Sequence, residues 1–66
     1  MTITVNGKAR HDVDAQTIEG LVRELNLPPE TLLIEHNENP LRRADWSKQA
    51  LNEGDNIEFV RVVAGG

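Results

Sequence analysis

Apolar and polar residues alternate over the first five positions, Met1-Thr2-Ile3-Thr4-Val5, and two of the apolar side chains are β-branched. A period of two predicts a strand with one buried face. Asn6-Gly7 follows directly, and both residue types tolerate the positive φ angles that a two-residue hairpin turn requires. The pattern therefore predicts a hairpin. Its second strand, from about Lys8 to Val13, is more polar and is expected at a sheet edge.

The next segment carries apolar residues at the spacing of one helical face, at Ile18, Leu21, Val22 and Leu25. Thr17 precedes them as the expected N-cap. Asn26 can adopt the left-handed conformation that ends a helix, and Pro28-Pro29 prevent the helix from continuing. Gly20 is expected on the water-facing side, without a packing reason, at a cost of roughly 0.5–1 kcal/mol relative to alanine.

The second half of the chain predicts short strands separated by turns. Strands are expected over Leu32–His36, Leu41–Ala44 and Ile57–Val63, and turns at Glu38-Asn39-Pro40 and Glu53-Gly54-Asp55. One helical turn with Asp45 as its N-cap is expected over Asp45–Lys48. The most hydrophobic strands are the first and the last, so we expect them to be neighbours at the centre of the sheet.

The order of elements predicts an α+β domain in which one main helix packs on a four- to five-stranded mixed sheet. This arrangement is the β-grasp, the ubiquitin-like architecture. We expect the domain to span residues 1–63, followed by a flexible Ala-Gly-Gly tail over residues 64–66.

The length and composition of the chain argue against several classes of function. A chain of 66 residues leaves little room for a deep substrate cavity, so a self-contained enzyme is not expected. The absence of cysteine excludes thiolate metal sites and cysteine nucleophiles, and we expect no metal site. A net charge of −4 disfavours nucleic-acid binding. No apolar stretch is long enough to span a membrane, and the class expected is a cytoplasmic domain.

The end of the sequence carries the candidate chemistry. Gly65-Gly66 follows directly after the last predicted strand. From Ala64 the tail would extend roughly 10 Å, and a backbone with almost no side chains can enter a tunnel that any branched residue would block. The carboxylate on Gly66 would become an acyl donor once adenylation by ATP turns one of its oxygens into part of a leaving group. Alone, two final glycines are weak evidence, because many chain ends are frayed.

Several features stand in a specific order: the 66-residue length, the opening Ile3-Thr4-Val5-Asn6-Gly7, the Thr17 helix with Leu21 and Leu25, the Gly54-Asp55 turn and the ending Val62-Val63-Ala64-Gly65-Gly66. Together they resemble the ThiS family, the β-grasp sulfur carriers of thiamine biosynthesis. The segment Arg42-Arg43-Ala44-Asp45-Trp46 is also similar to the stretch from proline or arginine to tryptophan common in that family. The resemblance covers the whole chain.

The resemblance implies a cycle that depends on partners. An adenylating enzyme of the ThiF type would form an acyl-adenylate on Gly66, and a cysteine desulfurase or another sulfur donor would convert it into a thiocarboxylate. A thiazole synthase of the ThiG type would accept the sulfur. The chain itself would be a carrier and not an enzyme, monomeric when free, with no bound cofactor and with ATP used by the partner. Only Gly65 and Gly66 carry over as functional residues.

The last strand also suggests a docking surface. Alternation places Ile57 and Phe59 on one face and Glu58, Val60 and Val62 on the other. If the first pair meets the helix, the valines remain exposed. We therefore expect a partner to dock on Val60, Val62, Val63 and Ala64. The alternative is that neighbouring strands or a bulge bury the valines.

Other polar residues favour structural interpretations. His11 and His36 are expected to be isolated, Arg42-Arg43 to be a solvated pair, and Trp46 to plug one end of the core. Six acids are expected at the surface, where they could steer the domain toward a basic partner: Glu30, Glu35, Glu38, Glu53, Asp55 and Glu58.

Three other functions stay open from the sequence. A MoaD-like carrier for molybdopterin synthesis would share the Gly-Gly ending but is usually longer. A ubiquitin-like modifier conjugated to lysines would have an arginine-rich segment before the glycines, whereas Val62-Val63-Ala64 is apolar. A third alternative is a plain interaction module, and an end at the second glycine argues against it.

Overall fold

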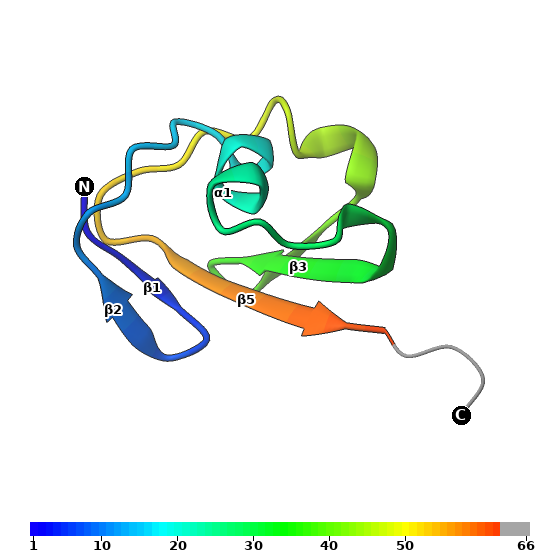
Figure 1. Ribbon diagram of the computed structural model, residues 1–66, viewed down its shortest axis with the longest axis horizontal. Coiled ribbons are helices and arrows are strands. Elements are labelled where there is room, and N and C mark those ends of the chain that lie inside the picture. Colours follow the sequence, from blue (N-terminus) through cyan, green and yellow to red (C-terminus); the bar gives the residue numbers. More distant parts are fainter. Residues whose placement is uncertain (63–66) are drawn as a thin grey trace.

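Five strands form one mixed sheet, and one α-helix covers one of its faces in the computed structural model, which describes residues 1–62 (Figure 1). The strands are β1 (Ile3–Val5), β2 (Lys8–Arg10), β3 (Leu32–His36), β4 (Asn39–Leu41) and β5 (Asn56–Arg61), in the order β2-β1-β5-β3-β4. The first and last strands pair in parallel at the centre, and the other pairs are antiparallel. The α+β layout and the central position of these two strands are confirmed.

The predicted first hairpin is confirmed, with a shorter second strand. Asn6 and Gly7 take φ angles of 49° and 81°, as the turn requires. Strand β2 lies at the edge, and all three of its residues are exposed. It ends at Arg10, and three residues later the buried Val13 bonds back to Met1 through both its backbone N–H and its C=O.

The helix α1 (Ile18–Glu24) begins and ends as the sequence predicts. The Thr17 hydroxyl accepts a 3.0 Å hydrogen bond from the Gly20 N–H, and Asn26 follows the helix with a φ of 56°. The expectation that Gly20 has no packing reason is wrong. A Cβ at Gly20 would lie 3.3 Å from the Thr17 hydroxyl oxygen and 3.4 Å from the Ala15 Cβ. Glycine therefore leaves room for the capping group.

The connections of the second half differ from the prediction in two places. Asn37 and Glu38 adopt positive φ angles and make the turn, so the next strand starts at Asn39 instead of Leu41. Pro40 is tolerated because β4 is an edge strand. Short 3-10 helices lie before β3, at η1 (Pro29–Thr31), and after β4, at η2 (Arg43–Asp45). The expected turn after Asp45 is present, because the Lys48 and Gln49 N–H groups both donate to the Asp45 carbonyl, but η2 begins two residues before it.

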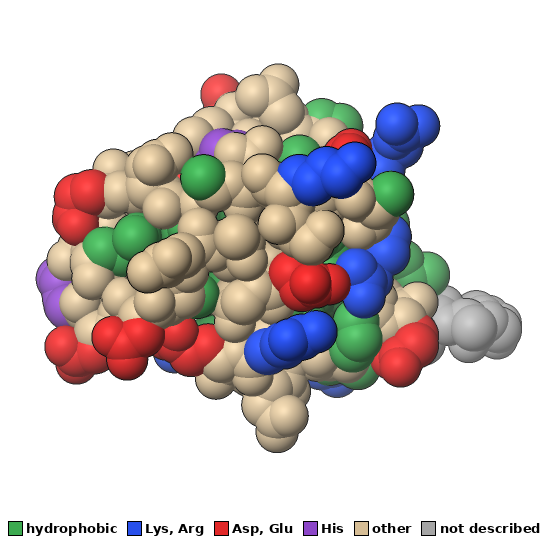
Figure 2. Space-filling view, turned by 90° about the horizontal axis from the view of Figure 1, so that it is seen from above, with side chains coloured by type: hydrophobic (Ala, Val, Ile, Leu, Met, Phe, Trp, Pro, Cys, Tyr) green, Lys and Arg blue, Asp and Glu red, His purple; other side chains and the backbone are tan. Residues whose placement is uncertain are grey.

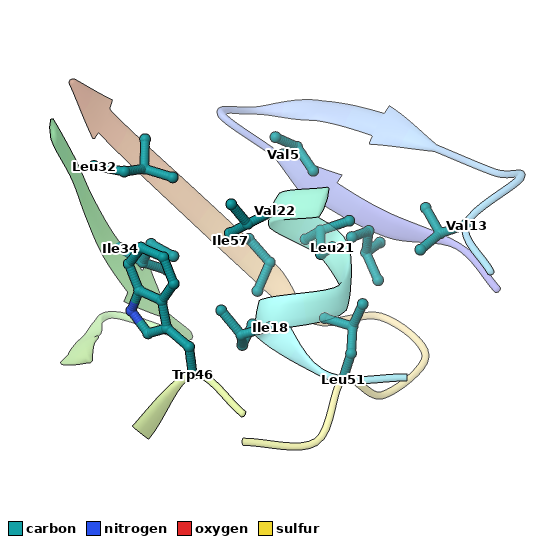
Figure 3. Packing of buried hydrophobic residues seen from close by; sticks show 11 residues of the cluster. Val5, Val13, Ile18, Leu21, Val22, Leu32, Ile34, Trp46, Leu51 and Ile57 are labelled. Atoms are coloured by element: carbon teal, nitrogen blue, oxygen red, sulfur yellow. The ribbon is translucent and has the colours of Figure 1, made fainter. Parts of the chain in front are cut away.

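The core fills the space between the sheet and α1 (Figure 3). It contains Ile3, Val5, Val13, Ile18, Leu21, Val22, Leu32, Ile34, Trp46, Leu51 and Ile57. Trp46 is only 1% exposed, so its predicted role as a plug of the core is confirmed. Among residues 1–62, the buried core side chains all come from residues before Glu58, and Phe59 packs against them at the margin.

Candidate functional site

The last strand presents its two faces as the alternation predicts. Ile57 is fully buried, and Phe59 packs against the core from the same side of the sheet. Val60 and Val62 point to the opposite side and remain 55% and 46% exposed. Neither neighbouring strands nor a bulge covers them, so the alternative of burial is wrong.

A third exposed apolar side chain lies beside the valines. Leu33 on β3 stands directly opposite Val60 on β5 and is 59% exposed. We call Leu33, Val60 and Val62 the β3–β5 patch. Sequence reasoning missed Leu33 because it sits inside an apolar run, Leu32-Leu33-Ile34. The signal was available: in any strand the middle residue of such a run faces away from its two neighbours.

The backbone of β5 is held on the β3 side up to the last described residue and on the β1 side up to Phe59. The Val62 N–H donates a 2.7 Å hydrogen bond to the carbonyl of Thr31, the last residue of η1. Earlier in the strand, the Phe59 N–H donates a 2.7 Å bond to the Asn6 side-chain oxygen. The strand therefore forms a fixed support from which the chain continues. The predicted site residues Val63, Ala64, Gly65 and Gly66 lie outside the described residues.

At the other end of β5, a buried carboxylate joins two turns. Asp55 is 7% exposed and accepts hydrogen bonds from the Asn52 N–H, the Asn37 amide and His36 Nε2, the last at 2.8 Å. Burial alone raises the pKa of Asp55, but these hydrogen bonds and the charge of His36 outweigh it and hold the pKa below its usual value. The expectations of an isolated His36 and a surface Asp55 are therefore wrong, and the role of the pair is structural.

The two arginines before Trp46 also differ from the expected solvated pair. Arg43 lies 3.2 Å from the Glu19 carboxylate, and its guanidinium carbon is 4.5 Å from the centroid of the Trp46 ring. It thus tethers η2 to α1 through an ion pair and a cation–π contact. Arg42 remains mostly exposed, 3.7 Å from Asp45. The Asp45 side chain makes this ion pair instead of capping a helix.

Among residues 1–62, no group of three His, Asp or Glu side chains is placed to hold a metal ion. No helix there is long and apolar enough to cross a membrane.

The sequence profile of the ThiS family matches residues 3–66, which is nearly the whole chain. The chain belongs to the ThiS family. Its fold agrees with a ThiS crystal structure from Geobacter metallireducens, described as a thiamine biosynthesis protein, with a TM-score of 0.86 at 29% identity over the full length of both chains. The solution structure of a thiamine biosynthesis protein from the same organism has a TM-score of 0.82 and is covered over 88% of its length.

Curated relatives of this ThiS family member include a sulfur carrier protein and two thiazole synthases. The sulfur carrier protein ThiS of Escherichia coli strain K12 is 27% identical over the whole of both chains. Two thiazole synthases, from Paramagnetospirillum magneticum and Magnetococcus marinus, are 29% and 33% identical over all 66 residues. The chain spans only one fifth of the length of each synthase, 20% in both cases. The predictions of a β-grasp fold and of membership in the ThiS family are confirmed.

Proposed function

We propose that this chain carries sulfur as a thiocarboxylate on Gly66 and donates it for thiazole formation. The observation that carries the proposal is the match of the ThiS family over residues 3–66, which includes both final glycines. The structure is compatible with this role because backbone hydrogen bonds hold the chain at Val62, four residues before Gly66, and β5 is bonded on its other side up to Phe59. A fixed strand would hold the position from which a reacting group must reach its partner.

The chemistry would take place on the carboxylate and in a partner's active site. A carboxylate oxygen attacks the α-phosphorus of ATP, and pyrophosphate leaves. The terminal sulfur of a protein persulfide then attacks the acyl carbon, and AMP leaves. A thiol reduces the resulting S–S bond and releases the thiocarboxylate. In this scheme the chain is the acyl substrate and not the enzyme, it binds no cofactor itself, and the adenylating partner binds the ATP.

Three partners follow from this cycle. A ThiF-type adenylating enzyme would dock on Val60 and Val62 and on the residues that follow, Val63 and Ala64. A cysteine desulfurase or an equivalent donor would supply the sulfur. A ThiG-type thiazole synthase would accept it, which is supported by the relatives named thiazole synthase that contain a segment similar to this chain. We place the cycle in the cytoplasm, where ATP and reducing thiols are available.

Intact-mass measurement of the protein purified from its own cells tests the proposal. The expected species ends at Gly66 and has the mass gained when one carboxylate oxygen is replaced by sulfur. Removal of the adenylating enzyme from those cells should abolish this species and create a growth requirement for thiazole. An isopeptide-linked adduct on other proteins would instead support a ubiquitin-like modifier. A growth defect relieved by molybdopterin and not by thiazole would overturn the proposed pathway.

A further inference from the structure

The sheet face turned away from α1 carries acids but no basic side chains at its strand positions. By pairing and alternation this face holds Thr4, Ala9, Leu33, Glu35, Pro40, Asn56, Glu58 and Val60. The basic residues of the strands, Lys8, Arg10 and Arg61, have the opposite parity. Seen from the helix side, Lys and Arg side chains gather toward the end at which β5 finishes (Figure 2). The open face is therefore acidic, although cations are abundant on the other side.

Two of these acids face each other. Glu35 on β3 is the direct cross-strand partner of Glu58 on β5. Opposite Cβ atoms in an antiparallel pair lie only about 4.5–5.5 Å apart, and like charges in this position destabilise the pair. Neither carboxylate takes part in an ion pair within residues 1–62. The domain keeps a repulsive pair on an open surface, uncompensated by its own side chains.

The acidic pair adjoins the apolar patch. Leu33 and Val60 form the open-face pair two residues along the same two strands, and the pair between them, Ile34 with Phe59, points to the core side of the sheet. The open face thus places two carboxylates directly beside the β3–β5 patch. A partner that covers the patch must also exclude water from the edge of the acidic pair. Coulomb interactions strengthen as water is removed.

We propose that the open sheet face binds a protein surface whose apolar side chains cover the β3–β5 patch while one Lys or Arg inserts between Glu35 and Glu58. The inference rests on the proposed function, because it concerns the surface on which the adenylating enzyme would dock. A basic side chain at this point relieves the repulsion and gains two charge-assisted hydrogen bonds. A competing surface that lacks it leaves two carboxylates partly desolvated and unpaired, so the pair selects among apolar partners.

The test compares the affinities of charge-neutral variants for the adenylating enzyme of the same cells. Glu35→Gln and Glu58→Gln keep the size of the side chain and remove one charge each. Each should raise the Kd by about fivefold to tenfold at low salt, and the loss should shrink as salt screens the interaction. Glu38→Gln is the matched control, because Glu38 lies in the β3–β4 turn and not on the open face. Its Kd should stay within about twofold of the unmodified chain.

The outcomes separate this inference from the proposed function. If the unmodified chain is neither bound nor adenylated, the inference and the proposed function are both wrong. If it is bound and adenylated but the two variants bind like Glu38→Gln, or more tightly, only the basic contact is overturned. Misfolding does not confuse the result, because removal of one like charge should leave the melting temperature unchanged or slightly higher. A variant that melts much lower would show that the two carboxylates are structural, and would also overturn the inference.

Discussion

The side chain of Asn6 accepts a hydrogen bond from the backbone N–H of Phe59, 53 positions later in the sequence. The backbone N–H of Asn6 also donates to the Ile57 carbonyl at 2.9 Å. One turn residue therefore extends the parallel pairing of β1 and β5 beyond the end of β1. The contact fixes the part of β5 that lies directly before Val60.

Replacement of Asn6 should separate its conformational role from its hydrogen bond. Asn6→Gly tolerates the φ of 49° but removes the acceptor for the Phe59 N–H, so the free energy of unfolding should fall by about 0.5–1.5 kcal/mol. Asn6→Asp keeps an acceptor and should lose less. Urea unfolding of both variants measures the difference. Equal stability of Asn6→Gly and the unmodified chain would show that the contact contributes nothing.

Asp55 should make the stability of the domain depend on pH in the acid range. Its folded-state pKa is lowered, so the unfolded chain takes up a proton first as the pH falls. The stabilisation is fully present above the unfolded-state pKa of about 4 and is lost as the pH falls through the lower folded-state value. Asp55→Asn should lower the free energy of unfolding by about 1–3 kcal/mol at pH 7 and flatten its decline below pH 4.

Chemical denaturation between pH 7 and pH 2 measures this effect. Asp12→Asn is the control, since Asp12 is an exposed residue in the connection between β2 and α1. It should leave the curve close to that of the unmodified chain. If the free energy of unfolding of Asp55→Asn falls below pH 4 as steeply as that of the unmodified chain, other carboxylates cause the pH dependence.

Charge introduced on the β3–β5 patch should affect binding and not folding. Val60→Asp and Val62→Asp replace exposed side chains, so the melting temperature should change little. Affinity for the adenylating enzyme should fall by at least about tenfold, because a carboxylate would be buried without a partner. Ala9→Asp, on the same face but on edge strand β2, is the control and should bind normally. Normal binding of both valine variants would place the docking surface elsewhere.

Changes in the length of the chain end should abolish sulfur loading without loss of stability. Within residues 1–62 the core is complete at Ile57, with partly buried Phe59 at its margin, so we expect the melting temperature not to depend on Gly66. One residue added after Gly66 shifts the carboxylate by about 3.5 Å, and a misplacement of 1 Å can cost about 10²-fold in rate. Deletion of Gly66 should be equally inactive, and Gly66→Ala less so. Intact mass after incubation with the adenylating enzyme, ATP and a sulfur donor reports loading. Full loading of the extended chain would contradict the mechanism.

Replacement of Gly20 by alanine should not give the stabilisation that alanine usually gives within a helix. Alanine is intrinsically better by about 0.8–1.0 kcal/mol, but its Cβ would press against the hydroxyl that caps α1. The expected result for Gly20→Ala is no gain in the free energy of unfolding, or a small loss. A full gain of about 1 kcal/mol in urea unfolding would show that Thr17 yields without weakening the cap.

Local patterns were enough to predict the first hairpin, the helix and the phase of β5, because each depends on near neighbours. The Asn6-Gly7 turn requires only residues that accept positive φ. That Ile57 and Phe59 both face the core follows from strand alternation alone. Leu33 could have been found by the same argument. The ThiS family resemblance added the sulfur chemistry, which no spacing in the described residues shows.

Contacts between distant segments were not predictable in this way. His36 and Asp55 are 19 positions apart and meet only because two turns converge at one end of the sheet. The Glu35–Glu58 pair likewise depends on the register between β3 and β5. No local signal sets that register, so both features needed the assembled fold.

The central place of β5 has a consequence for how the chain can be made. Strands β1 and β2 form one hairpin and β3 and β4 another, and within the sheet only β5 joins them. A nascent chain on the ribosome therefore cannot close its sheet until its last strand has been released. Until then Ile3, Val5, Leu32 and Ile34 lack the strand that lies between them in the finished sheet. Degradation that trims the chain back into β5 would likewise unfold the domain. Chains that have lost β5 should therefore not accumulate in a folded form that competes with intact chains for the partners.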